Sequence, residues 1–87
     1  MLPLECSWSG ASIRAESRIS DISMGGCYVD CRNVPPPGTD VHLSISLGGA
    51  RLEVDGLVVH NHPNIGFGVR FNELAPDVRA VFESHLG

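Results

Sequence analysis

Apolar and polar residues alternate one by one along most of this chain, and this period of two constrains the fold more than any other feature. The first such segment is residues 2–8, whose apolar members are Leu2, Leu4, Cys6 and Trp8. Successive side chains of a β-strand point to opposite faces of the sheet, so the alternation predicts a strand with one buried and one exposed face. We therefore expect a chain built mainly from half-buried β-strands.

Six segments follow this pattern, and glycine and proline residues typical of turns separate them. They are residues 2–8, 12–20, 27–32, 40–47, 50–61 and 65–71. In the fifth segment Leu57 and Val59 interrupt the polar face, so we expect its second half to be covered on both sides. Six short strands at this spacing predict a small antiparallel barrel or sandwich.

Residues 76–86 change period and predict one amphipathic helix at the end of the chain. Side chains recur there at spacings of three and four, namely Val78, Val81, Phe82 and His85. Pro76 suits the first helical turn and Asp77 suits the positive end of the helix dipole. The expected fold class is therefore all-β with one C-terminal α-helix packed against the sheet.

Glycine pairs mark two of the expected turns. Gly48 and Gly49 lie between two alternating segments, as in hairpins with a two-residue loop. Gly25 and Gly26 end the connection formed by residues 21–26. We expect left-handed backbone conformations there, because glycine adopts positive φ without steric cost.

The length and composition limit the classes of function. A chain of 87 residues predicts one domain, residues 1–87, and the six arginines, the absence of lysine and a net charge of −4 argue against DNA, RNA or anionic membranes as partners. No run of about 18 apolar residues occurs, so membrane insertion is not expected. Three cysteines cannot all pair within one chain, which favours the reducing cytoplasm as the location.

Neither a catalytic site nor a metal site is predicted, and we expect no cofactor. No Ser, Lys or His stands in a pattern that marks a nucleophile and its base, so an enzyme is not expected. Cys27 and Cys31 are four residues apart, or about 13 Å along a strand. Sulfurs bound to one zinc lie within about 4 Å of each other, so we expect buried thiols instead. His60 and His62 share one face and are interpreted as a polar strand end.

The connection formed by residues 21–26 is the strongest candidate for ligand binding. Asp21 can accept hydrogen bonds, Ser23 offers a hydroxyl group, and the two glycines leave backbone N–H groups accessible. Arg14 and Arg18 lead into this turn on one face of a strand, with Glu16 between them. The arginines are either an anion-binding pair or part of a solvated face of mixed charge.

Several motifs together resemble the PilZ domain family. They are Asp21-Ile22-Ser23-Met24-Gly25-Gly26, which fits an Asp/Asn-x-Ser-x-x-Gly motif, Pro36-Pro37-Gly38-Thr39, Val54-Asp55-Gly56-Leu57-Val58-Val59, and Gly66-Phe67-Gly68-Val69-Arg70-Phe71. Their order and spacing cover nearly the whole chain. The resemblance implies a six-stranded antiparallel β-barrel with one C-terminal helix, in agreement with the periodicity.

The resemblance also implies a ligand, the bacterial second messenger cyclic di-GMP. It assigns the binding of guanine and phosphate to Asp21 and Ser23, with Gly25 and Gly26 shaping the turn. The family also uses an Arg-x-x-x-Arg motif upstream of the first strand, and no arginine precedes Arg14 in this sequence. Arg14 and Arg18 have the same spacing within the second expected strand, and they are candidates for substitute cations.

Two hypotheses follow for the function. The first is a signalling domain that binds cyclic di-GMP and acts on a bacterial effector protein or a fused upstream domain in motility, pilus or exopolysaccharide control. Under it, the given sequence is a fragment whose arginine motif lay upstream, or a divergent domain that binds the dinucleotide weakly. The alternative is a divergent adaptor that does not bind cyclic di-GMP and works through protein contacts.

Overall fold

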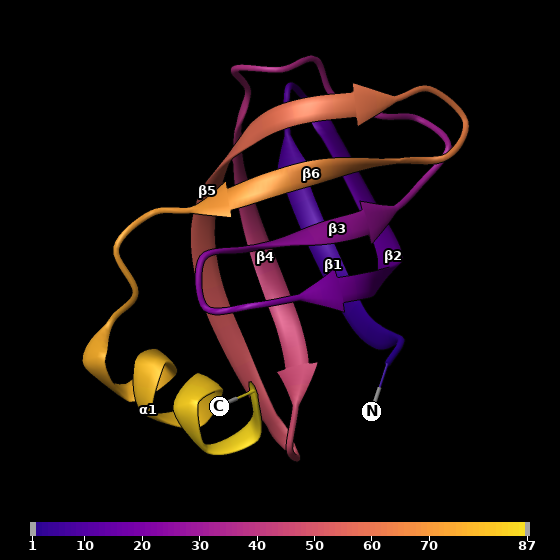
Figure 1. Cartoon of the computed structure of the whole chain (residues 1–87). Helices are drawn as coiled ribbons and strands as arrows, with labels where there is room; N and C mark the ends of the chain where they lie inside the picture. Colours follow the sequence, from indigo (N-terminus) through magenta and orange to yellow (C-terminus); the bar gives the residue numbers. More distant parts are fainter. Residues whose placement is uncertain (1, 87) are drawn as a thin grey trace.

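Six antiparallel strands close into a barrel, and a helix covers one of its ends (Figure 1). The computed structural model describes residues 2–86. The strands are β1 (Leu4–Gly10), β2 (Ile13–Ile22), β3 (Gly26–Asp30), β4 (Asp40–Leu47), β5 (Ala50–His62) and β6 (Gly66–Phe71), followed by α1 (Pro76–Leu86). Around the barrel their order is β1-β2-β3-β6-β5-β4. The predicted fold class, a six-stranded antiparallel barrel with one C-terminal helix, is confirmed.

The apolar residues of the alternating segments fill the inside of the barrel. Trp8 is 1% exposed and meets Phe67 edge to face, with ring centroids 4.9 Å apart, an arrangement that aromatic pairs prefer. The indole Nε1 of Trp8 donates a hydrogen bond of 3.1 Å to the Ser17 hydroxyl, so the polar group of this buried ring has a partner. Other buried members are Leu4, Cys6, Ile19, Val29, Leu43, Ile45, Val58 and Val69.

Helix α1 lies at the lower left in Figure 1, beside the ends of β4 and β5, and its buried side chains belong to the core of the barrel. Val78 and Phe82 are one turn apart and both are buried, and the Phe82 ring lies 5.7 Å from that of Phe71. Pro76 opens the helix and Asp77 lies in its first turn, as their propensities predict. No helix in the described part of the chain has the length and apolar character needed to cross a membrane.

Two hairpins of the barrel turn through two successive residues in left-handed backbone conformations. Gly48 and Gly49 have φ of 60° and 80°, which confirms the predicted two-residue turn between β4 and β5. Ala11 and Ser12 form the corresponding turn between β1 and β2, with φ of 51° and 64°. Neither residue favours this conformation, so the tight turn carries some backbone strain that glycine would relieve.

Several local predictions were wrong, each for a reason visible in the structure. Strand β2 continues through Ile22, so Asp21 is a strand residue and not part of the turn. Gly25 and Gly26 do not adopt positive φ; the turn closes instead through backbone hydrogen bonds. Cys31 follows the end of β3 and is only half-buried, with its thiol directed to the Asn33 carbonyl.

The second half of β5 is not covered on both sides. Val59 is 43% exposed, whereas Val58 is buried. The ladder between β5 and β6 shifts register between Val58 and His60, so Val59 is the extra residue of a β-bulge. An additional residue at this point leaves the outer face of the strand open to solvent.

Candidate functional site

Two β-bulges place the key side chains of the candidate site on the outside of the barrel. In β2 the register shifts between Ile19 and Asp21, and Asp21 then lies opposite Tyr28. Without the shift Asp21 would follow the buried Ile19 by two residues and point into the core. The shift in β5 acts in the same way on His60, which lies opposite Gly68 although it follows the buried Val58 by two residues. Both polar side chains therefore reach solvent on one side of the molecule.

A shallow hollow of about 310 Å³ lies between these two bulges. The polar groups around it are Asp21, Ser23, Tyr28 and His60, and its floor includes the backbone of Gly26 and Gly68. Two predicted ligand-binding side chains, Asp21 and Ser23, thus share one concave surface with Gly26. Gly25 lies in the adjoining turn and is exposed.

Three rings form an aromatic surface at this hollow. Tyr28 lies 6.1 Å from His60 and 6.0 Å from His62 between ring centroids, and the two imidazoles lie 5.4 Å apart. The Tyr28 hydroxyl and Nδ1 of His62 are hydrogen-bonded at 3.0 Å. The rings therefore hold one another in place on the outer face of β3 and β5.

Glycines in β6 make room for these rings. A Cβ atom at Gly68 would overlap the His60 ring, coming within 2.7 Å of Nε2 and 2.8 Å of Nδ1. A Cβ atom at Gly66 would lie 2.9 Å from Cζ of Tyr28. The rings lie directly over the backbone of β6, which the sequence pattern did not reveal. The Gly-x-Gly spacing opposite Tyr28 and His60 is the signal that could have indicated it.

The turn between β2 and β3 is held by its own backbone. The Ser23 N–H donates to the Gly26 carbonyl at 2.9 Å, and the Phe71 N–H donates to the Gly25 carbonyl at 2.8 Å. The Ser23 hydroxyl lies 3.5 Å from the same Gly26 oxygen, at the long limit of a hydrogen bond. This hydroxyl is exposed and can rotate toward a ligand at little cost.

Gly26 is required for close packing and not for a left-handed conformation. A Cβ atom there would overlap the carbonyl oxygen of Val69 on the neighbouring strand β6. Gly25, in contrast, has no atom within 4 Å of a built Cβ. The two glycines of the motif therefore have different structural roles.

The thiol of Cys27 lines the same hollow from below and is chemically inert at neutral pH. Burial raises the pKa of this thiol to about 12, and the charges of Cys6 and Asp21 add to the shift. The thiolate is the reactive form of cysteine, so Cys27 contributes a packed sulfhydryl group to the site. Among residues 2–86, no group of three or more His, Cys, Asp or Glu side chains is arranged to hold a metal ion.

Arg14 and Arg18 line other hollows than the one beside Asp21. Arg14 borders a hollow of about 570 Å³ together with His42, and Arg18 borders one of about 450 Å³ together with Arg51. The structure brings Asp21, Ser23 and Gly26 together, and it does not bring either arginine to the hollow that they line. Any role of Arg14 and Arg18 toward the same ligand stays a prediction.

The closed barrel, its terminal helix and the Asp-x-Ser-x-x-Gly motif between β2 and β3 together define the class of the domain, a small six-stranded β-barrel with one C-terminal helix. Residues 2–87 match the family model of the PilZ domain, so the chain belongs to the PilZ domain family, whose members are regulatory binding domains. No curated protein sequence matches the chain.

A solved structure with the same fold is the crystal structure of the PilZ domain of CeSA from a cellulose-synthesizing bacterium. It superimposes with a TM-score of 0.71 and covers 93% of this chain and 86% of its own. The sequences are 19% identical, so the likeness establishes the fold alone. The ligand of this chain has to be inferred from its own residues.

Proposed function

We propose that this PilZ domain binds cyclic di-GMP in the hollow between the two bulges. The observation that supports the proposal most strongly is the position of Asp21, Ser23 and Gly26 around one concave surface that also carries aromatic rings. PilZ domains form a family of cyclic di-GMP receptors, and the motif residues here lie together and are open to solvent.

The chemistry of guanine suits this surface. Its N1–H and N2–H groups form a donor edge, and the exposed carboxylate of Asp21 is an acceptor with two oxygens. The ring faces of Tyr28 and His60 offer a stacking surface, and one stacked base contributes about 1–3 kcal/mol of binding free energy. The exposed Ser23 hydroxyl is a donor for a phosphate oxygen.

Arg14 and Arg18 enter the proposal as substitute cations for the phosphates. Because they line different hollows, they would have to contact a ligand that extends around β2 from the Asp21 side. Replacing each arginine with Ala distinguishes a role in ligand binding from a position on the solvated outer face. A loss of affinity supports a role in binding, and unchanged affinity assigns both to the outer face of the barrel.

Isothermal titration calorimetry with cyclic di-GMP tests the proposed function, and cyclic di-AMP is the matched control ligand. Adenine lacks the N1–H and N2–H donors, so we expect saturable heat with the guanine dinucleotide alone. Asp21→Ala should weaken binding about 5- to 150-fold, because a ligand donor left without its partner costs about 1–3 kcal/mol. Absence of heat at millimolar cyclic di-GMP contradicts the proposal.

We further propose that the domain acts on a bacterial partner protein or a fused upstream domain in the cytoplasm. The resemblance of its fold to the PilZ domain of CeSA supports control of exopolysaccharide synthesis as one such process. Co-purification with effector proteins in the presence and absence of cyclic di-GMP tests this part. Capture that does not depend on the dinucleotide contradicts signal transfer.

A further inference from the structure

The outer face formed by β2, β1, β4 and β5 carries a second concave surface, away from the hollow beside Asp21. Its floor consists of four serines from the two central strands, Ser7, Ser9, Ser44 and Ser46, and we call it the serine trough. Two hollows of about 570 Å³ and 450 Å³ lie along it and share Ser7 and Glu16 in their linings. Short side chains in the middle and long charged ones on both sides explain why the surface is hollowed.

The charged side chains of the trough lie in three bands across the strands. In the first band, Arg14 of β2 lies opposite Ser9 of β1, and Ser9 lies opposite His42 of β4. In the second, Glu16 lies opposite Ser7 in β1, and Glu53 lies opposite Ser44 in β4.

The third band contains Arg18, opposite Glu5, and Arg51, opposite Ser46. Each outer band also holds one carboxylate, Asp55 opposite His42 and Glu5 opposite Arg18, against two cationic side chains. Residues two apart on a strand are separated by about 6.8 Å, so the net charge along the trough runs positive, negative, positive at that interval when His42 is protonated.

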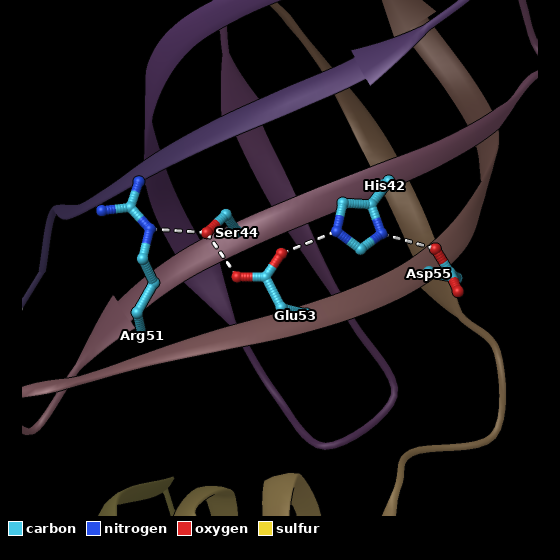
Figure 2. Close-up of polar contacts among 5 residues, drawn as sticks. All are labelled: His42, Ser44, Arg51, Glu53 and Asp55. Atoms are coloured by element: carbon cyan, nitrogen blue, oxygen red, sulfur yellow. Dashed lines mark hydrogen bonds and ion pairs between the residues drawn. The ribbon is translucent and has the colours of Figure 1, made fainter.

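In the first band His42 lies between two carboxylates, an arrangement that favours its imidazolium form (Figure 2). Its Nδ1 lies 2.7 Å from Asp55 and its Nε2 lies 2.7 Å from Glu53, and since carboxylates only accept, both nitrogens donate. The hydrogen bond to Asp55, followed by that to Glu53, raises the pKa of His42 above its usual value.

The central side chains are fixed by the same set of hydrogen bonds. The Ser44 hydroxyl donates to Glu53 at 2.8 Å, and Nε of Arg51 donates to Ser44 at 2.7 Å (Figure 2). On the opposite side, Arg14, Glu16 and Arg18 make no ion pair within residues 2–86 and are exposed. One side of the trough is therefore preorganised, and the other has charges without a partner.

These features identify the chemistry of the occupant. Of the two rings that line the trough, Trp8 is 1% exposed and His42 is hydrogen-bonded at both nitrogens by Asp55 and Glu53, so the trough lacks the group of rings found at the Asp21 hollow. Both signs of charge are present, which does not suit a polyanion. An extended peptide carries alternate side chains on one face at about 6.8 Å, the same interval as the bands.

We propose that the serine trough is a docking site for an extended segment of a partner protein whose alternate residues are acidic, basic and acidic. The basic side chain lies between Glu16 and Glu53, and the acidic ones lie at the bands of Arg14 with His42 and of Arg18 with Arg51. The serine hydroxyls supply hydrogen bonds to the peptide backbone. The trough shares no lining residue with the Asp21 hollow, and the inference does not rest on cyclic di-GMP binding, although Arg14 and Arg18 enter both proposals.

The probe is the blocked peptide acetyl-Gly-Asp-Ser-Lys-Ser-Asp-Gly-amide, titrated at low salt into the ¹⁵N-labelled domain and followed by amide chemical shifts. The control is its charge-inverted form, acetyl-Gly-Lys-Ser-Asp-Ser-Lys-Gly-amide. The domain carries a net charge of −4, so nonspecific attraction favours the control peptide. We expect saturable shifts on β1, β2, β4 and β5 with the first peptide and none with the control. Equal responses, shifts outside these strands or no saturation at several millimolar would overturn the proposal.

A charge exchange at Glu16 gives a second test. The Glu16 side chain makes no hydrogen bond or ion pair within residues 2–86, so Glu16→Lys should leave the fold intact, as the spread of amide shifts would show. The variant should bind the probe about five- to tenfold more weakly, because an exposed attraction becomes a repulsion. It should gain affinity for acetyl-Gly-Asp-Ser-Asp-Ser-Asp-Gly-amide. Asp21→Ala is the matched control and should bind the probe like the original domain.

Discussion

Replacing three neighbouring glycines with alanine, one at a time, tests how the candidate site is built. Gly25, Gly26 and Gly68 lie around the same turn and hollow, and none has a positive φ, so alanine causes no backbone strain at these positions. They differ in what a Cβ atom would meet. At Gly25 it would meet nothing, at Gly26 a backbone carbonyl of β6, and at Gly68 the exposed ring of His60.

The three magnitudes follow from these contacts. Gly25→Ala should stabilise the domain by about 0.4–1 kcal/mol, because alanine reduces the entropy of the unfolded chain. Gly26→Ala should destabilise it by about 1–3 kcal/mol, since two hydrogen-bonded strands must move apart. For Gly68→Ala the strand propensity gained, about 0.5–1 kcal/mol, offsets a similar cost of turning the His60 side chain, so the change should stay within about 1 kcal/mol.

Thermal unfolding followed by circular dichroism, with urea titrations for free energies, distinguishes these outcomes. For a domain of this size a loss of 1–3 kcal/mol lowers Tm by about 4–24 °C. The ring resonances of His60 should shift in Gly68→Ala and stay unchanged in Gly25→Ala. If Gly26→Ala and Gly68→Ala lose equal stability, or if Gly26→Ala loses less than about 0.5 kcal/mol, the close approach of β3 and β6 is not the reason for the glycine.

Four further predictions concern stability and reactivity. The hydrogen bonds to Asp55 and Glu53 raise the pKa of His42 in the folded state. Its contribution to the free energy of unfolding is therefore complete below pH 6.5 and is lost as pH rises through the raised pKa. In urea titrations, the free energies of unfolding of the domain and of His42→Ala should converge at high pH. The hydrogen bond from His42 lowers the pKa of Glu53. The contribution of Glu53 to the free energy of unfolding should therefore be present above pH 4.5 and be lost as pH falls through the lowered pKa. Ser12→Gly should stabilise the domain by about 1 kcal/mol by relieving a left-handed serine, and an unchanged urea midpoint would argue against strain in this turn. Burial raises the pKa of Cys27 to about 12 and of Cys6 to about 11, so neither should react with iodoacetamide at pH 8 until urea unfolds the chain, as mass spectrometry of the labelled cysteines would show.

The barrel could be predicted from the sequence because its determinant is local. Period-two alternation decides which face of each strand is buried, and the Gly48-Gly49 pair defines its hairpin directly. The turn at Ala11 and Ser12 lacked any such signal, since neither residue favours the positive φ that it adopts. Barrel closure between β1 and β4 depends on pairing between distant strands, and the family resemblance supplied it.

The candidate site was only partly predictable, because its geometry depends on two register shifts. Asp21 and Ser23 were identified as motif residues, but alternation alone directs Asp21 toward the core. The bulges that turn Asp21 and His60 outward come from the cross-strand ladders, which no single segment encodes. For the same reason the position of His42 between Asp55 and Glu53 of the next strand could not be predicted.

Amide chemical-shift mapping with cyclic di-GMP tests the central claim most directly, because it reports both binding and location. We predict saturable shifts at Asp21, at the turn that follows β2, at Tyr28, at His60 and at Gly68. Further shifts at Arg14 and Arg18 would support their role as substitute cations. Asp21→Ala should require about 5- to 150-fold more ligand for the same shifts, and Gly25→Ala should titrate like the original domain. An unchanged spectrum at millimolar cyclic di-GMP, or shifts confined to another face of the barrel, would contradict the account.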